Sequence, residues 1–219
     1  MKIATWNLQR LDKRTNNLIL EKLVEIDADI LILTETNTAI QLDNYNCIST
    51  ELLPTDFDGI KYKGGEIRVS ILTKYNIAAR HDTFDKFTTV CTDLETPFGL
   101  LTIYGSIIGV FGNRQPRFDS DLNGQLSDFE ILFPNRQICF AGDLNTTFSG
   151  RPWPSKKARE ILIDAFDRFE LINTTADIVD TVDHIVLSDE LLINKKLEIE
   201  IWNTQKKLSD HVGHMITLT

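Results

Sequence analysis

The sequence has 219 residues, of which 42% are hydrophobic, and this length and composition predict one globular domain over residues 1–219 rather than a disordered chain. A net charge of −9 disfavours a protein that coats duplex DNA through electrostatics, although it does not exclude a nuclease. No apolar run approaches the roughly 20 residues of a membrane span. The strand-like pattern from Lys2 leaves no room for a signal peptide, and the three scattered cysteines suit a reducing compartment, so we expect a cytoplasmic location.

Short runs rich in β-branched and aromatic residues recur along the chain and predict strands. In chain order they span residues 2–8, 29–35, 45–51, 66–74, 77–84, 87–95, 99–107, 136–142, 181–187, 197–203 and 212–218. Residues 66–84 and 88–107 each have the pattern of a hairpin, the second with a turn at Pro97-Phe98-Gly99.

Helical spacing occurs in three places between these strands. The predicted helices span residues 16–26, residues 117–133, and a segment that follows the N-cap residue Ser155 and continues to Phe169. Many strands interleaved with few helices predict an α+β sandwich, in which two packed sheets are flanked by helices.

Five polar clusters stand at the tips of predicted strands. They are Thr5-Trp6-Asn7, Thr34-Glu35-Thr36, Gly142-Asp143-Leu144-Asn145, Val182-Asp183-His184-Ile185 and Ser209-Asp210-His211. Carboxylate and amide oxygens bind hard cations such as Mg²⁺, and a histidine among them suits acid–base work. Each cluster alone is also typical of a polar residue that ends a strand or starts a turn. Five in this order indicate a metal-dependent active site.

In order and position these clusters resemble the endonuclease/exonuclease/phosphatase superfamily, the DNase I-like metal-dependent phosphoesterases, from Met1 to Thr219. The resemblance implies a four-layer α/β/β/α sandwich of two mainly antiparallel sheets, with the active site at one end. It also implies that Glu35 is the principal ligand of Mg²⁺, for which Mn²⁺ can substitute, and that Asn7 and Asp210 lie beside the metal.

The same resemblance assigns catalytic roles to five further residues. It implies that Asp143 activates the attacking water, that Asn145 orients this water, and that Asp183 and His211 form a dyad. The histidine of such a dyad stabilises charge on the phosphoryl oxygens. The position that matches Tyr104 holds a Tyr or His that contacts the phosphate or the leaving group, although Tyr104 also fits an interior aromatic residue of a strand.

Cations beside aromatic residues mark candidate substrate contacts, because this mixture suits phosphate binding and base stacking. The candidates are Arg114 and Arg117 in the segment Phe111–Phe118, Arg151, Trp153 and Lys156 in the segment Arg151–Lys157, and Arg68 after Gly64-Gly65-Glu66. Plain surface loops have the same composition, and that alternative stays open for each segment.

Three departures from the abasic-site branch of the superfamily make abasic-site cleavage doubtful. Ile107 replaces an Asn that grips phosphate, Gln9 replaces an Asp, and Asp180 replaces an aromatic residue. We therefore expect a nuclease or phosphodiesterase that acts on nucleic acid. The alternatives are a phosphatase or phosphodiesterase for a small molecule or lipid head group, and a catalytically inactive binding module. The sequence leaves open DNA against RNA, the cleavage mode and the oligomeric state.

Overall fold

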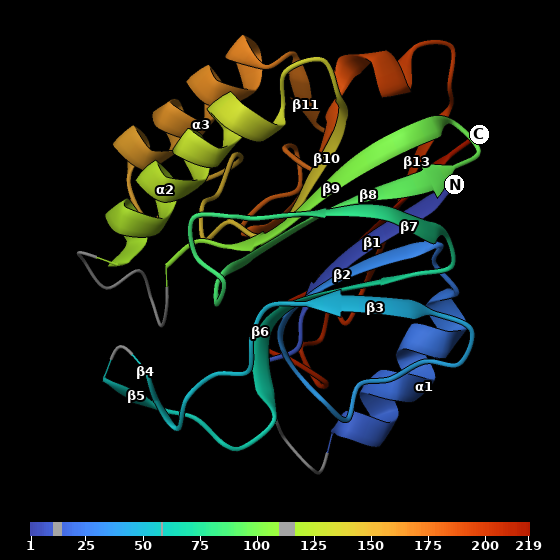
Figure 1. Cartoon of the computed structure of the whole chain (residues 1–219). Helices are drawn as coiled ribbons and strands as arrows, with labels where there is room; N and C mark the ends of the chain where they lie inside the picture. The colour runs from blue at the N-terminus through green and yellow to red at the C-terminus, as the bar shows by residue number, and fades with distance from the viewer. Residues whose placement is uncertain (11–14, 58, 110–116) are drawn as a thin grey trace.

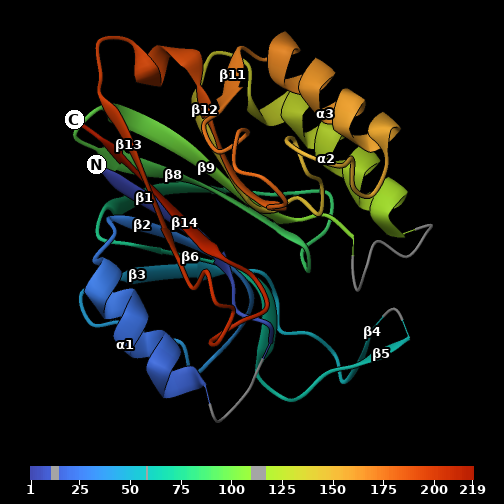
Figure 2. The same cartoon turned by 180° about the vertical axis from the view of Figure 1, so that it is seen from behind.

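The computed structural model describes residues 1–10, 15–57, 59–109 and 117–219, and it shows a four-layer sandwich (Figure 1). Two six-stranded sheets pack face to face, in the orders β13-β14-β1-β2-β6-β3 and β11-β12-β10-β9-β8-β7. Helices cover the outer face of each sheet, as Figures 1 and 2 show from opposite sides. The α+β sandwich expected from the sequence is confirmed.

The strands of the first sheet are β1 (Lys2–Asn7), β2 (Ile30–Asn37), β3 (Asn46–Ser49), β6 (Glu66–Thr73), β13 (Leu197–Trp202) and β14 (Gly213–Leu218). Those of the second are β7 (Asn76–His81), β8 (Thr89–Thr96), β9 (Gly99–Ile107), β10 (Gln137–Asp143), β11 (Leu171–Asn173) and β12 (Asp183–Ser188). The pairs β1–β2 and β9–β10 are parallel, and the other named pairs are antiparallel.

Three helices form the outer layers, at the places that the sequence predicts. Helix α1 (Asn16–Ile26) lies on the first sheet, while α2 (Arg117–Leu132) and α3 (Lys156–Arg168) lie on the second (Figure 2). The Ser155 hydroxyl accepts a hydrogen bond from the Ala158 amide and so caps α3. A 3-10 turn, η1 (Asp189–Leu192), follows β12. Within the described ranges, no helix is both long and apolar enough to cross a membrane.

Each interface between layers has its own apolar core. Aliphatic side chains such as Ile32, Val69 and Ile103 fill the space between the sheets. Aromatic residues such as Phe129 and Phe140 pack with aliphatic ones under α2 and α3, and Trp6 lies in the core under α1. Each fully buried side chain of this size stabilises the fold by about 1.5–3 kcal/mol, so the sheets form a rigid frame for the residues at their ends.

One predicted hairpin is confirmed and the other is wrong. Strands β8 and β9 pair as expected, but β6 pairs with β2 and β3, and β7 pairs with β8 in the other sheet. Every residue of β6 is buried, which suits an interior strand. Exposed and half-buried residues alternate along β7, as at a sheet edge. The two-residue link between them therefore crosses from one sheet to the other.

A short arm, which the sequence did not predict, projects from the sandwich (Figures 1 and 2). It carries β4 (Asp56–Phe57) and β5 (Ile60–Lys61), which pair only with each other. The Phe57 ring packs against Phe87, at 4.8 Å between centroids, and anchors the arm to the body.

Candidate active site

Four of the predicted polar residues meet at one end of the sandwich. Asn7 ends β1 and Asp143 ends β10, and a 2.9 Å hydrogen bond from Asn7 Nδ2 to Asp143 Oδ2 joins the two sheets there. Asp183 begins β12 opposite Asp143, because antiparallel pairing makes these two residues register partners. His211 lies just before β14, with its Nδ1 2.6 Å from Asp183 Oδ2. Residues far apart in sequence thus form one hydrogen-bonded group.

The segment that carries His211 is fixed to β1 by hydrogen bonds. The Ser209 hydroxyl donates to the Asn7 carbonyl at 2.6 Å and accepts from the His211 amide at 3.1 Å. The His211 carbonyl accepts from the Trp6 indole at 3.1 Å and from the Asn203 side chain at 2.7 Å. The imidazole is therefore held in place from its backbone as well as through Asp183.

Electrostatics keep the His211 imidazole protonated at neutral pH. Burial lowers its pKa, but the charge of Asp183 and the hydrogen bond to it have the opposite effect and prevail. The net result raises the pKa of His211 to about 10. In this imidazolium Nδ1–H donates to Asp183, and a positive charge is available at the strand ends.

Asp143 is a buried carboxylate with both oxygens engaged. Its side chain is 2% exposed, Oδ1 accepts from the Asn145 amide at 2.9 Å, and Oδ2 accepts from Asn7. Burial first, and then the negative charge of Asp183, raise the pKa of Asp143 well above its usual range. Such a carboxylate is a stronger proton acceptor than an exposed one.

Glu35 lies at an interruption in the pairing of β2. Residues 34 and 36 pair with β6 in the same register, whereas Glu35 is left out of the ladder with a φ of 44°. Burial raises its pKa, as does the negative charge of Asp210, while His211 and the hydrogen bond from Asn7 lower it. A buried carboxylate beside a second carboxylate is a chemical environment that a divalent cation stabilises.

A second set of donor atoms also has the spacing of a metal site. Ligand atoms of Asp143, Asp183 and His211 all lie within 4.8 Å of one another, close enough to share a metal ion. However, the raised pKa of His211 keeps its imidazole protonated, and an imidazolium has no lone pair for a metal. This set is therefore better described as a hydrogen-bonded dyad beside a carboxylate.

Gln9 and Asn145 form hydrogen bonds to residues and backbone groups at the edge of the candidate site. The Gln9 amide donates to Asn7 Oδ1 at 2.8 Å, and its side-chain oxygen accepts from the Asp210 amide at 3.0 Å. Asn145 lies in a turn beyond β10 with a φ of 45°, and its Nδ2 donates to the Ile108 carbonyl at 2.9 Å. The sequence singled out Gln9 only as a departure from a pattern, so its positioning of two site residues was missed.

Tyr104 lies away from this group, which corrects the expectation that it contacts phosphate. Its side chain is fully buried beside Phe129 in the layer under α2, and its hydroxyl donates to Asp128 Oδ2 at 2.7 Å. Strand β9 continues three residues further, and Ile107 is the register partner of Asp143. Tyr104 therefore lies within β9, whose bounds match the predicted strand, and fits the alternative of an interior aromatic residue.

Of the predicted substrate contacts, Arg68 and Arg117 bind other side chains of the protein. Arg68 is 2% exposed, its Nη2 donates to the Tyr62 hydroxyl at 2.9 Å, and it lines a small cavity together with Glu35. Arg117 forms an ion pair with Asp121, at 2.8 Å. Arg114 lies outside the described residues. Arg68 is therefore next to the site, whereas Arg117 anchors the start of α2.

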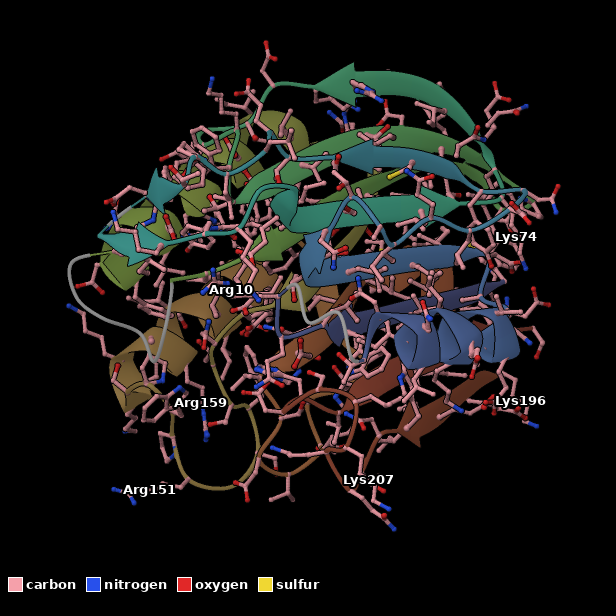
Figure 3. The ribbon with its side chains drawn as sticks, turned by 90° about the horizontal axis from the view of Figure 1, so that it is seen from below. Arg10, Lys74, Arg151, Arg159, Lys196 and Lys207 are labelled. Carbon is pink, nitrogen blue, oxygen red and sulfur yellow. The ribbon has the colours of Figure 1, made fainter. Side chains whose placement is uncertain are left out.

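The other three candidates, Arg151, Trp153 and Lys156, are exposed on the segment that leads into α3. Arg151 points away from the molecule (Figure 3). Arg159, which the sequence did not single out, donates from Nε to the Thr147 carbonyl at 2.5 Å and holds this segment to α3. These exposed side chains have no contact with the Asp143 group.

A family model described as "Endonuclease/Exonuclease/phosphatase family" matches residues 4–211. A search of curated protein sequences found no match. The match covers all five polar clusters, including the segments of both sheets that form the candidate site.

Solved structures with the same fold include AP endonucleases and a 3′ phosphatase. The AP endonuclease LMAP from Leishmania major has a TM-score of 0.74 at 15% identity, covering 98% of this chain and 86% of that one. An AP endonuclease from Archaeoglobus fulgidus has a TM-score of 0.72 at 12% identity, covering 100% and 99%. The 3′ phosphatase NExo from Neisseria, bound to a product DNA hairpin, has a TM-score of 0.70 at 13% identity, covering 100% and 99%. At such identities the likeness concerns the fold.

Proposed function

Since this chain belongs to the endonuclease/exonuclease/phosphatase family, we propose that it is a metal-dependent phosphoesterase that hydrolyses phosphodiester bonds of nucleic acid. One observation carries the proposal. The buried Asp143 carboxylate and the Asp183–His211 pair stand side by side at the strand ends, cross-linked through Asn7. A proton acceptor beside a fixed positive charge is what hydrolysis at phosphorus requires.

We assign the divalent cation to Glu35, with Asn7 and Asp210 beside it. The donor set fits, because carboxylate and amide oxygens bind Mg²⁺, or Mn²⁺ in its place, better than a zinc ion. Burial and the neighbouring Asp210 charge both disfavour an uncompensated Glu35 carboxylate. When bound, such a cation would neutralise phosphate oxygens and stabilise the leaving oxygen.

The remaining steps fall to side chains of the chain itself. Asp143 accepts a proton from the attacking water, and its raised pKa favours that transfer near neutral pH. The hydrogen bonds from Asn7 and the Asn145 amide hold the Asp143 carboxylate in one orientation. His211, charged and aligned by Asp183, stabilises the negative charge that develops on the phosphoryl oxygens.

A small phosphoester is the second candidate substrate. The net charge of −9 favours it over extended duplex DNA, since a long polyanion gains affinity mainly from many cationic contacts. A short or single-stranded nucleic acid needs fewer such contacts and remains our first choice.

The test is hydrolysis of end-labelled single- and double-stranded DNA and RNA, with and without Mg²⁺, by wild type and by His211→Ala. His81→Ala is the matched control, because His81 Nε2 lies 2.9 Å from Asp93 in an Asp–His pair on β7 and β8, outside the site. We expect metal-dependent cleavage by wild type and the control, and loss of cleavage in His211→Ala. Cleavage of small phosphoesters alone would favour the second candidate. No hydrolysis of any phosphoester by folded wild type would refute the proposal.

A further inference from the structure

Two side-chain contacts join the same pair of segments at the candidate active site. Strand β12 lies in the second sheet and β14 in the first, and the two pack against each other across the sandwich (Figure 2). The first contact is the one between Asp183 at the start of β12 and His211 just before β14. In the second, Thr181 Oγ1 lies 2.7 Å from His214 Nε2, and both of these residues are buried. This second contact has no part in the chemical steps described above.

The second contact lies in the layer between the sheets. Side chains two residues apart on a strand share a face, so His214 lies on the same face of β14 as Ile216, and Asp183 on the same face of β12 as Ile185. Both isoleucines belong to the core between the sheets. The hydrogen bond between Thr181 and His214 therefore joins one sheet to the other.

This hydrogen bond continues to the backbone of Asp183. Burial lowers the pKa of His214, against the opposing charge of Asp183, and the positive charge of His211 lowers it as well. The His214 imidazole is therefore neutral and carries a single N–H. The one hydroxyl hydrogen of Thr181 donates to the Asp183 carbonyl, at the longer distance of 3.3 Å. Thr181 Oγ1 then accepts from His214 Nε2–H, which completes a chain of two hydrogen bonds from the ring to Asp183.

Asp183 depends on its backbone for its orientation. Its Oδ2 contacts His211, whereas none of the described residues donates a hydrogen bond to its buried Oδ1. In Asp143, by contrast, both carboxylate oxygens accept hydrogen bonds. The direction of the Asp183 carboxylate is thus set by His211 on one side and by the peptide group that Thr181 contacts on the other.

Resting on the proposed function, we propose that Thr181 and His214 are positioning residues for hydrolysis. A single hydrogen bond leaves the starts of β12 and β14 free to rotate about it, and the second contact removes that freedom. The Asp183–His211 pair is thereby kept in line with the reacting phosphate. Because Thr181 and His214 are buried and touch no substrate, they act on kcat more than on KM.

The experiment removes the hydrogen bond from either end and then restores it. Thr181→Val and His214→Leu delete the hydroxyl and the N–H group but keep an apolar side chain of similar size. Thr181→Ser keeps the hydroxyl, and His214→Gln keeps an N–H group at the end of the side chain. Ser188→Ala is the matched control, because Ser188 is a buried hydroxyl at the other end of β12, where it accepts from the Ile138 amide at 2.8 Å.

Three properties of each variant are compared with wild type. The first is kcat and KM in Mg²⁺, for a single-stranded DNA oligonucleotide and for bis(p-nitrophenyl) phosphate. The second is the proton NMR resonance of His211 Nδ1–H, which reports on the 2.6 Å contact with Asp183. The third is the melting temperature, which reports on stability.

We expect Thr181→Val and His214→Leu each to lower kcat roughly tenfold, the effect of about one hydrogen bond, with little change in KM. The His211 resonance should shift in both variants, because the dyad is no longer held in one geometry. Thr181→Ser and His214→Gln should recover most of the kcat. The double variant Thr181→Val with His214→Leu should lose no more kcat than either single variant, since all three lack the same contact. Ser188→Ala should lower the melting temperature but keep the kcat and the resonance of wild type.

An equal fall of kcat in Ser188→Ala, or a His211 resonance that stays in place in Thr181→Val and His214→Leu, would overturn the proposal and leave both residues with a structural role alone. If His214→Leu does not fold, Thr181→Val carries the test, because valine keeps the shape of threonine. If wild type hydrolyses neither substrate, the proposed function fails separately. The His211 resonance then decides the positioning role by itself: a shift in Thr181→Val that Thr181→Ser reverses supports it, and no shift overturns it.

Discussion

Replacing Asp183 with Asn tests the electrostatic basis of the site. The substitution keeps the size of the side chain and one acceptor oxygen, but it removes the negative charge 2.6 Å from His211 Nδ1. The pKa of His211 is raised from 6.5 to about 10 against the opposing effect of burial. At 1.36 kcal/mol for each pKa unit, that rise corresponds to about 5 kcal/mol.

Without the Asp183 charge, the pKa of His211 is raised only by Asp143 and Asp210 while burial still lowers it, so we expect it to fall well below 10. A fall to about 6.5 would leave the imidazolium on about a quarter of the molecules at pH 7 and lower kcat/KM about fourfold from protonation alone. On the alkaline side, kcat/KM of the variant should fall at a lower pH than that of wild type, whereas protonation of Asp143 limits both on the acid side. The pKa is measured by NMR titration of the imidazole, and kcat/KM is measured from pH 5 to 9.

The matched control is Asp93→Asn, which alters the Asp–His pair with His81 and leaves the site intact. We expect it to keep the pKa of His211 and the pH profile of wild type. An Asp183→Asn protein whose His211 still titrates near 10 would refute the electrostatic argument. An unaltered pH profile despite a lowered pKa would show that the imidazolium is not needed for hydrolysis.

Three further predictions concern stability. His184 is fully buried, and burial lowers its pKa from 6.5 to about 4, so stability that is present above pH 6.5 is lost as the pH falls towards 4. Between pH 7 and pH 5 the free energy of unfolding should fall by about 2 kcal/mol for this reason. Urea unfolding at both pH values should show this fall in wild type but not in His184→Gln. An equal fall in both proteins would contradict the prediction. Gly142→Ala should lower the free energy of unfolding by about 3 kcal/mol or more, because the φ of Gly142 is 137° and an added Cβ would lie 1.9 Å from the Ser106 carbonyl oxygen. An unchanged melting temperature would show that β9 and β10 move apart enough to accept the Cβ. Ser155→Ala should cost about 1 kcal/mol of unfolding free energy by removing the α3 cap, whereas Ser155→Gly should cost only a few tenths; an equal cost for both would argue against the cap.

Local patterns predicted most elements of the fold but not all of the strand pairing. The spacing of apolar residues predicted α1, β2 and β10. Helix α1 buries one apolar face, and nearly every residue of β2 and β10 is buried. The link between β6 and β7 has the length of a hairpin turn, and its sequence carries no sign that the two strands join different sheets. The arm with β4 and β5 escaped prediction because two-residue strands are too short for a periodic signal.

The same distinction applies to the candidate site. Polar residues at the ends of predicted strands brought Asn7, Asp143 and His211 into view; their chemical roles stay predictions. The role that the resemblance implied for Tyr104 does not fit, because its side chain lies within β9 and its hydroxyl donates to Asp128 under α2. Gln9 could not be found this way, because its role depends on a contact with a residue 201 positions away.

Charge balance gives the site an expected order of binding under the proposed function. Glu35, Asp143 and Asp183 outnumber the single imidazolium of His211, and burial raises the pKa of both Glu35 and Asp143. In their ionised form these carboxylates would repel an approaching phosphate. A divalent cation held by Glu35 would offset their charge and favour the ionised form, so we expect the metal to bind before the substrate.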